Sequence, residues 1–143
     1  MAAGLESSPR PLPSMRILKL RVLDPPFAVC RLDRADISLT RNLGGPFSSL
    51  SVTEDEVSLV CVESAVPQGA DVEGGWRCLK VEGPLSFSEV GILSSLTTTL
   101  AAAGVSLFAV STWDTDYLMV KQESLEMAIE VLEAAGHELE SPL

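Results

Sequence analysis

The order of strand-like and helix-like segments in the second half of the chain constrains the fold more than any other feature. In order, the strand-like and helix-like segments are 76–81, 86–103, 105–111, 116–120, 124–135 and 137–139. The second and fifth have apolar side chains at helical spacing, and the others are short runs typical of strands. The order strand–helix–strand–strand–helix–strand predicts a ferredoxin-like βαββαβ unit, an α+β fold with an antiparallel sheet.

Both expected helices carry sequence signals for where they begin and end. Ser86 and Glu89 have the spacing of a capping box, and Gly104 is placed to end the first helix. Ser124 is the expected N-cap of the second helix, and Gly136 ends it. The apolar stripes are Leu93, Leu96, Leu100 and Ala103 on the first helix, and Leu125, Ala128, Ile129, Leu132 and Ala135 on the second. Each helix is therefore expected to bury one face against the sheet.

The first half of the chain is irregular and predicts four strands with little helix. The expected strands are 16–24, 27–33, 47–52 and 57–62, with a proline-stiffened turn at Asp24-Pro25-Pro26 between the first two. Residues 34–47 show no clear period. We therefore divide the chain into a disordered tail (1–14, with Met15 as an alternative start), an irregular first module (15–66), a linker rich in glycine (67–75) and a second module (76–139).

Charge and composition exclude several classes of protein. Twenty acidic and ten basic residues give a net charge of −10, which a phosphate backbone would repel, so nucleic-acid binding is not expected. Residues 1–50 carry +3 and residues 51–143 carry −13, which favours a solvated acidic surface or, alternatively, an orientation of two halves or two copies. No apolar run reaches the ~20 residues of a membrane-spanning helix, and residues 1–14 lack the apolar core of a signal peptide.

The cysteines and the histidine do not suggest catalysis. Cys30, Cys61 and Cys78 are odd in number and have no CxxC or zinc spacing, so we expect reduced thiols in a cytoplasmic protein. The sole histidine, His137, has no nucleophile near it in sequence. Asp114 and Asp116 have D-x-D spacing, but nothing nearby completes a metal-ligand set. We expect no enzyme activity, no metal and no cofactor.

Three blocks of the second half resemble the ACT domain superfamily. They are GILSSL at 91–96, LAAAGVS at 100–106 and STWDTDYLMV at 111–120. The nearest resemblance is to the branch that holds small two-module bacterial ACT proteins and the cytosolic arginine sensors of the animal TORC1 pathway. The first half resembles this branch more weakly, through FAVCRLD at 27–33, through 45–61 and through Val66-Pro67. The resemblance covers about residues 15–139 and implies two tandem ACT-like modules, the first of them degenerate.

ACT domains are regulatory modules that typically bind an amino acid between two ACT units, so the resemblance implies an amino-acid sensor. The arginine sensors contact their ligand through acidic residues at the positions of Glu89 and Asp116, which implies an amine-bearing ligand such as arginine. This chain has two modules rather than four, so a complete site between ACT units is expected to require a homodimer. An unidentified protein target is a further expected partner.

The residues themselves suggest how such a ligand would be held. The N-terminus of the first helix offers free N–H groups to a carboxylate, and Gly91 has no Cβ to block the approach. Asp116 can accept charge-assisted hydrogen bonds from an ammonium or guanidinium group. The predicted ligand-binding residues are Ser86, Glu89, Val90, Gly91, Ser111, Thr112 and Asp116.

Simpler interpretations of these residues stay open at this point. Glu89 is also explained by helix capping alone, and Asp116 by a hydrogen bond to the backbone of Ser111 or Thr112 in its own turn. The alternative function is an ACT-like structural or protein-interaction module that binds no ligand.

Overall fold

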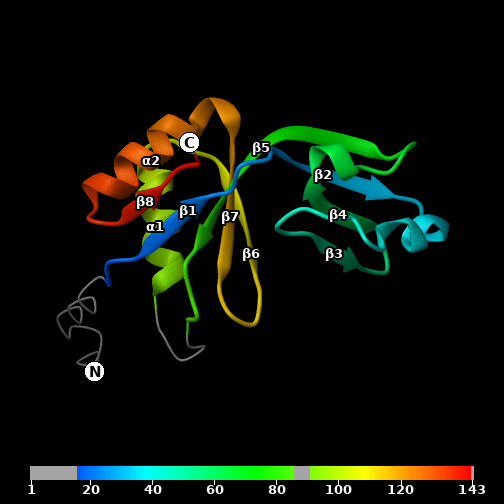
Figure 1. Ribbon diagram of the computed structural model, residues 1–143, viewed down its shortest axis with the longest axis horizontal. Helices are drawn as coiled ribbons and strands as arrows, with labels where there is room; N and C mark the ends of the chain where they lie inside the picture. Colours follow the sequence, from blue (N-terminus) through cyan, green and yellow to red (C-terminus); the bar gives the residue numbers. More distant parts are fainter. Residues whose placement is uncertain (1–15, 86–90, 143) are drawn as a thin grey trace, which may run out of the picture.

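A computed structural model describes residues 16–85 and 91–142, whose strands form one continuous sheet. The strands are β1 (Lys19–Val22), β2 (Phe27–Leu32), β3 (Ser49–Val52), β4 (Val57–Val62), β5 (Asp71–Val81), β6 (Leu107–Ser111), β7 (Asp116–Lys121) and β8 (Glu138–Glu140). The helices are α1 (Ile92–Ala102) and α2 (Leu125–Ala134), with short 3-10 segments η2 (Arg34–Thr40), η3 (Glu63–Ala65) and η4 (Gln122–Ser124). Figure 1 shows both helices at one end of the molecule, and β2, β3 and β4 at the other.

Strand β5 belongs to both halves of the sheet. The strand order is β3-β4-β2-β5-β1-β8, and β7 pairs with the other edge of β5 and carries β6 on its outer side. The first part of β5, residues 71–76, pairs with β2, whereas residues 76–81 pair with β7 and β1. One strand therefore supplies the central pairing of both halves.

The linker expected over 67–75 is wrong for residues 71–75, which are paired strand. The register between β2 and β5 shifts at Gly74 and Gly75, and Gly75 has a φ of +78°. The Gly75 N–H donates to Glu63 Oε2 at 2.7 Å, and a Cβ on Gly74 would lie 2.5 Å from the same oxygen. These glycines thus mark a β-bulge that a carboxylate approaches closely, rather than a flexible connection.

Strands β1 and β2, on either side of the Asp24-Pro25-Pro26 turn, each pair with β5. They lie end to end along the same edge of β5, joined where the Leu23 N–H donates to the Cys78 carbonyl at 2.9 Å. β1 is antiparallel to β5 and parallel to β8. Strand β1, which the sequence analysis assigned to the first module, therefore lies between β5 and β8, the first and last strands of the second module. Because β1 is far from both partners in the sequence, local sequence patterns could not predict this pairing.

The ferredoxin-like α+β unit expected in the second half is confirmed, in the order β5-α1-β6-β7-α2-β8. Its core lies between the helices and the sheet and contains Leu18, Leu20, Val22, Leu79, Val81, Leu96, Leu100, Val105, Leu118, Val120, Ala128 and Leu132. Gly104 ends α1 with a φ of +77°, as predicted, and donates its N–H to the Ala101 carbonyl at 3.0 Å. Ser124 is the N-cap residue of α2, although its side chain makes no cap hydrogen bond.

The first helix begins later than predicted. α1 starts at Ile92, and Gly91 before it has a φ of +82°, in the left-handed region that a continuous right-handed helix from 86 would not contain. The expected capping residues Ser86 and Glu89 lie outside the described residues, as does the tail at 1–14.

The sheet face opposite the helices is covered by the first half of the chain. Leu23, Phe27 and Phe47 join Cys78 and Met119 in a second cluster. The ring of Phe47 stacks on Tyr117 with centroids 4.1 Å apart, and Trp76 meets Phe108 edge-on at 4.7 Å. A third cluster (Cys30, Leu32, Val57, Leu59 and Cys61) fills the far end of the sheet, with Ile37 of η2 packed against it.

His137 fixes the junction between β1 and β8. Its side chain is only 4% exposed, and its Nδ1 accepts a hydrogen bond from the Leu18 N–H at 3.1 Å. The next residue, Glu138, donates its own N–H to the Leu18 carbonyl at 2.9 Å. Burial lowers the pKa of His137, because a charged imidazolium would lose its hydration.

We predict that His137 makes the protein less stable as the pH falls below about 6.5, its ordinary pKa. The unfolded chain takes up a proton there while the folded chain does not, so the stabilisation is complete above this pH and is lost as the pH falls toward the folded pKa. His137→Asn keeps an acceptor and does not titrate, so urea unfolding between pH 5 and 7 should show a flatter dependence. Because His137 is the sole histidine, equal slopes for variant and wild type would contradict this.

The three thiols lie in strands β2, β4 and β5 and are buried. Burial raises the pKa of Cys30, that of Cys61 to about 11 and that of Cys78 to about 12. We predict that a thiol reagent at pH 8 labels the folded protein slowly, at a rate that rises with urea as the protein opens. Immediate labelling of all three thiols without urea would show that these strands are wrongly placed.

Candidate functional site

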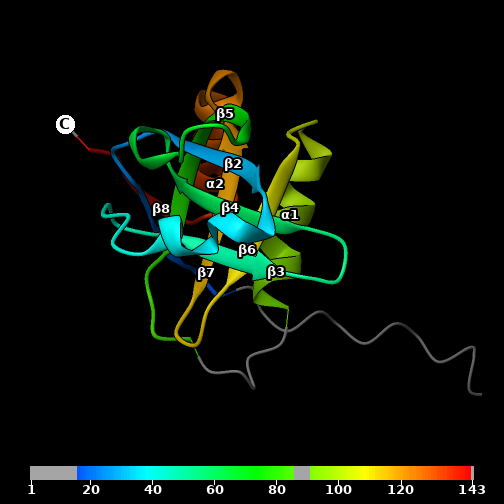
Figure 2. The same cartoon turned by 90° about the vertical axis from the view of Figure 1, so that its right-hand side faces the viewer.

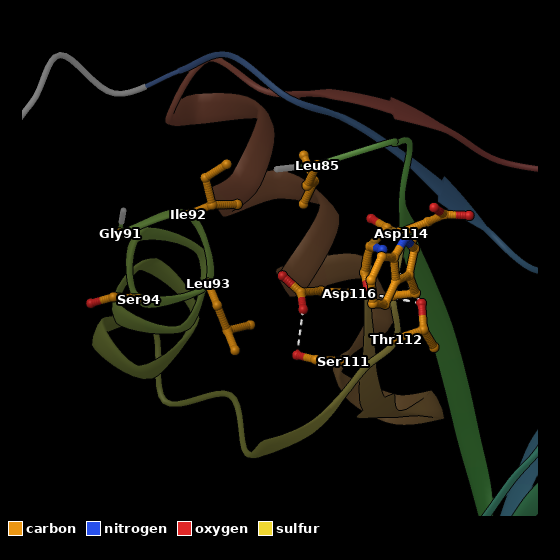
Figure 3. A pocket seen from close by; sticks show the side chains of 11 residues that line it. Leu85, Gly91, Ile92, Leu93, Ser94, Ser111, Thr112, Asp114 and Asp116 are labelled. Atoms are coloured by element: carbon orange, nitrogen blue, oxygen red, sulfur yellow. Dashed lines mark hydrogen bonds between the residues drawn. The ribbon is translucent and has the colours of Figure 1, made fainter. Parts of the chain in front are cut away.

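A cavity of about 250 Å³ lies between the start of α1 and the β6–β7 hairpin (Figure 3). It is lined by Leu85, Gly91, Ile92, Leu93, Ser94, Ser111, Thr112, Trp113, Asp114, Thr115 and Asp116. Four of the predicted ligand residues, Gly91, Ser111, Thr112 and Asp116, are thus brought together. The other three predicted residues, Ser86, Glu89 and Val90, lie outside the described residues.

One wall of the cavity is the first turn of α1. The first intrahelical hydrogen bond runs from the Ser95 N–H to the Gly91 carbonyl at 2.8 Å, so the N–H groups of residues 92–94 have no partner within the helix. The first turn has no acidic residue, and Gly91 offers no side chain to cap it. No side chain of the described residues caps this turn, so as far as they extend the positive end of the helix dipole is available to an anionic group. In Figure 3, Leu93 faces the hairpin, whereas Ser94 points away from it.

The opposite wall carries a carboxylate at a fixed place. Asp116 opens β7 directly across from Ser111, the last residue of β6. The Ser111 hydroxyl donates to Asp116 Oδ1 at 2.5 Å (Figure 3). This contact is between side chains, unlike the backbone hydrogen bond that the sequence left as an alternative. A carboxylate has about four acceptor positions, and the serine occupies one, so Asp116 can still accept from a cation.

The hairpin tip between these residues is held by several hydrogen bonds. Thr112 donates its N–H to the Thr115 carbonyl at 2.8 Å. Thr115, only 5% exposed, donates its hydroxyl to the Val81 carbonyl of β5 at 2.6 Å. The Leu85 N–H donates to the Asp114 carbonyl at 2.7 Å. The end of β5 therefore holds the turn that orients Asp116, and the Thr112-x-x-Thr115 spacing is the sequence signal that could have revealed it.

The charges and walls of the cavity are unevenly arranged. Asp114 and Asp116 lie on the hairpin side, and no lysine or arginine is among the lining residues. Leu85, Ile92 and Leu93, which sequence reasoning did not single out, give apolar walls. The cavity thus suits a molecule with one anionic and one cationic group. Among residues 16–85 and 91–142, no cluster of three or more potential metal ligands occurs.

Family models match both halves of the chain. An ACT domain family model matches residues 71–134, and a second model, described as an N-terminal domain, matches residues 26–69. A crystal structure of a protein from Agobacterium tumefaciens is 35% identical, has a TM-score of 0.79 and is covered over 96% of its length by 90% of this chain. The chain belongs to the ACT domain family.

Two further proteins resemble this ACT chain, one in sequence and one in fold. It is 37% identical over 59 residues to the human protein "Cytosolic arginine sensor for mTORC1 subunit 1", and the match spans 41% of this chain but only 18% of the sensor's length. The regulatory subunit of aspartate kinase from Thermus thermophilus has a TM-score of 0.59 at 12% identity, which shows a shared fold. No helix in the described parts of the ACT chain is long and apolar enough to cross a membrane.

We predict that Gly91→Ala lowers the free energy of unfolding by about 1–2 kcal/mol, the cost of a Cβ in the left-handed region. No atom of the described residues lies within 4 Å of the new Cβ, so among them the loss reflects the backbone angle and not a clash. Asn tolerates this region better, so Gly91→Asn should cost less in the same urea titration. If alanine is as stable as glycine, the φ of +82° at residue 91 is not the native one.

Proposed function

We propose that this ACT chain is a regulatory protein that binds an amino acid between α1 and the β6–β7 hairpin. The observation that carries the proposal is that Asp116, held by Ser111, lies across one cavity from the first turn of α1. An acceptor and a set of donors on opposite walls complement the two charged groups of an α-amino acid. The family supports a regulatory role, and one relative is named as an arginine sensor.

In this proposal the ligand carboxylate binds the N–H groups at the start of α1. Its ammonium or guanidinium group binds Asp116, with the second carboxylate, Asp114, adding to the negative potential. Ser86, Glu89 and Val90 stay candidates on the basis of sequence. An amine-bearing amino acid such as arginine is therefore the ligand we propose.

The unpaired cysteines and the regulatory role bear on where the proposed sensor acts and on what it acts with. Cys30, Cys61 and Cys78 are all unpaired, which suits the reducing cytoplasm. We include a homodimer and an unidentified protein target in the proposal, because a regulatory module acts by changing an equilibrium in which something else takes part.

The alternative function is an interaction module that binds no small molecule. Leu50 and Val52 on β3 and Val72 on β5 are exposed apolar side chains at the two edges of the first-half sheet, where a partner protein would find apolar surface. The ligand experiment below separates the two functions.

We predict that L-arginine raises the melting temperature of the wild type and that Asp116→Ala abolishes this shift. At a hundred times the dissociation constant, a ligand stabilises the folded state by roughly 2.7 kcal/mol, which is several degrees for a domain of this size. The unliganded variant should lose less than about 1 kcal/mol, because a surface acid contributes little to stability. L-citrulline, which keeps the α-amino acid and replaces the guanidinium by a neutral urea, shows which cationic group Asp116 receives.

Asp55→Ala is the matched control, since it removes an equal charge from the distant β3–β4 turn. It should leave the response to L-arginine unchanged. Glu89→Gln removes charge but keeps capping ability, so a lost response there would assign Glu89 to the ligand rather than to the helix. If none of the twenty amino acids raises the melting temperature of the wild type, the interaction module is the better interpretation. If an amino acid stabilises the wild type and Asp116→Ala equally, the site lies elsewhere.

A further inference from the structure

The first half of the chain repeats the strand arrangement that forms the candidate site. In the first half the strand order is β3-β4-β2-β5, and in the second half β6-β7-β5 follows the same pattern. A helical segment follows the first strand of each half: η2 comes after β2, and α1 after β5. Figure 2 looks onto the first half and shows η2 (cyan) lying over β4. The β3–β4 turn therefore corresponds to the β6–β7 turn.

The two turns also share their hydrogen bonds. The Thr53 N–H donates to the Glu56 carbonyl at 2.9 Å, and the Thr112 N–H donates to the Thr115 carbonyl at 2.8 Å. The Thr53 hydroxyl oxygen accepts from the Glu56 N–H at 3.0 Å, and that of Thr112 accepts from the Thr115 N–H at 3.4 Å. Both turns have the sequence Thr-x-Asp-x. The chain thus contains the same turn twice.

A second cavity lies at the corresponding place in the first half. It has a volume of about 380 Å³ and lies between the start of η2 and the β3–β4 turn. Its charged lining residues are Arg31, Asp33, Arg34, Asp55, Glu56 and Asp71. The Glu56 carboxylate accepts a hydrogen bond from the Ser58 hydroxyl at 2.7 Å. This repeats the serine-held carboxylate of Asp116 in the candidate site.

The two cavities differ in the residue that begins the helical segment. Ile92 is the first residue of α1 and gives the candidate site an apolar wall. Arg34 is the first residue of η2 and takes the same place in the second cavity. Its Nη2 donates to the Thr53 carbonyl at 2.5 Å and to the Glu54 carbonyl at 3.4 Å. The guanidinium of Arg34 therefore reaches from one wall of the cavity to the turn that forms the other.

The surroundings of this guanidinium favour a cation. Asp33, Asp55 and Glu56 line the same cavity, and carboxylates lower the energy of a nearby positive charge. The other arginine of the cavity, Arg31, pairs with Asp71 at 3.2 Å. A guanidinium is planar and weakly hydrated, so it gives up water to carbonyl oxygens more readily than an ammonium does.

We infer that Arg34 is an internal ligand: the first half contains a second cation-binding site, and the chain's own guanidinium occupies it. A group tethered to the wall has an effective concentration in about the millimolar range, so a free cation at micromolar concentration does not displace it. The site accepts a free alkylguanidinium only when the Arg34 side chain is removed. Each chain thus offers one open cavity, beside Asp116, to a free amino acid, and this last step rests on the proposed function.

The test is chemical rescue of Arg34→Ala by ethylguanidinium, which supplies most of the deleted side chain. The measurement is made with Asp116→Ala in both proteins, so that the candidate site does not respond. Arg34→Ala should lower the melting temperature by roughly 2–4 °C, because the turn loses its cation. Ethylguanidinium at about 20 mM, above the effective concentrations typical of tethered groups, should restore at least half of this loss. Ethylammonium at the same concentration should restore much less.

Two further variants are the controls. Arg41→Ala removes the same charge from the other end of η2, outside the cavity lining, so it should show neither the loss nor the rescue. Arg34→Lys keeps a cation on a similar stem, so it should stay folded and should gain little from ethylguanidinium, because its own ammonium repels the added cation.

The inference is overturned if ethylguanidinium raises the melting temperature of Arg34→Ala no more than that of the parent with Arg34 intact. It is also overturned if ethylammonium rescues equally well, or if Arg34→Lys responds as strongly as Arg34→Ala. Rescue of Arg34→Ala together with a wild type that does not respond to L-arginine supports the internal ligand and counts against the proposed function alone.

Discussion

The pairing of β5 on both of its edges is the interaction on which the rest of the structure depends. Its eleven residues hold β2, β1 and β7, and through them every other strand. The bulge at Gly74 and Gly75, where the two halves meet, is held from both sides: Glu63 accepts from Gly75, and Lys121 donates its Nζ to the Gly74 carbonyl at 2.9 Å. Lys121 also lies 4.6 Å above the Trp76 ring. One backbone thus orients the second half, and with it the cavity, relative to the first.

Local sequence patterns predicted the elements of the second half because these depend on neighbours a few residues away. Gly104 has to end α1, and the apolar spacing of α2 requires one buried face. The position of β1 could not be predicted in this way, since its partners are about sixty residues away in β5 and nearly one hundred and twenty away in β8. The sequence placed Gly74 and Gly75 in a linker for a related reason. Their place in the β-bulge depends on Glu63, which is too far away in sequence to belong to a local pattern.

The residues of the candidate site also differ in whether local sequence patterns could predict their positions. Ser111, Thr112 and Asp116 lie within six residues of each other, so the hairpin that joins them could be predicted from the sequence. The apolar walls from Leu85 and Leu93 could not, since they depend on how α1 crosses the sheet. The side-chain hydrogen bond between Ser111 and Asp116 follows from cross-strand register, which the sequence left undetermined. The start of α1 at Ile92 is a further case, since the left-handed backbone of Gly91 interrupts the continuous helix that the sequence predicted.

The insertion of β1 between β5 and β8 has a consequence for how the chain folds during synthesis. β1 leaves the ribosome nearly one hundred and twenty residues ahead of its parallel partner β8 (Glu138–Glu140). Until then β1 can pair with β5 alone, and the edge that β8 will cover stays exposed. Contacts between such distant segments slow folding, and uncovered strand edges invite association with other chains. Strand β1 is therefore completed only when β8 has been made, and the nascent protein has most need of a chaperone in the interval before that.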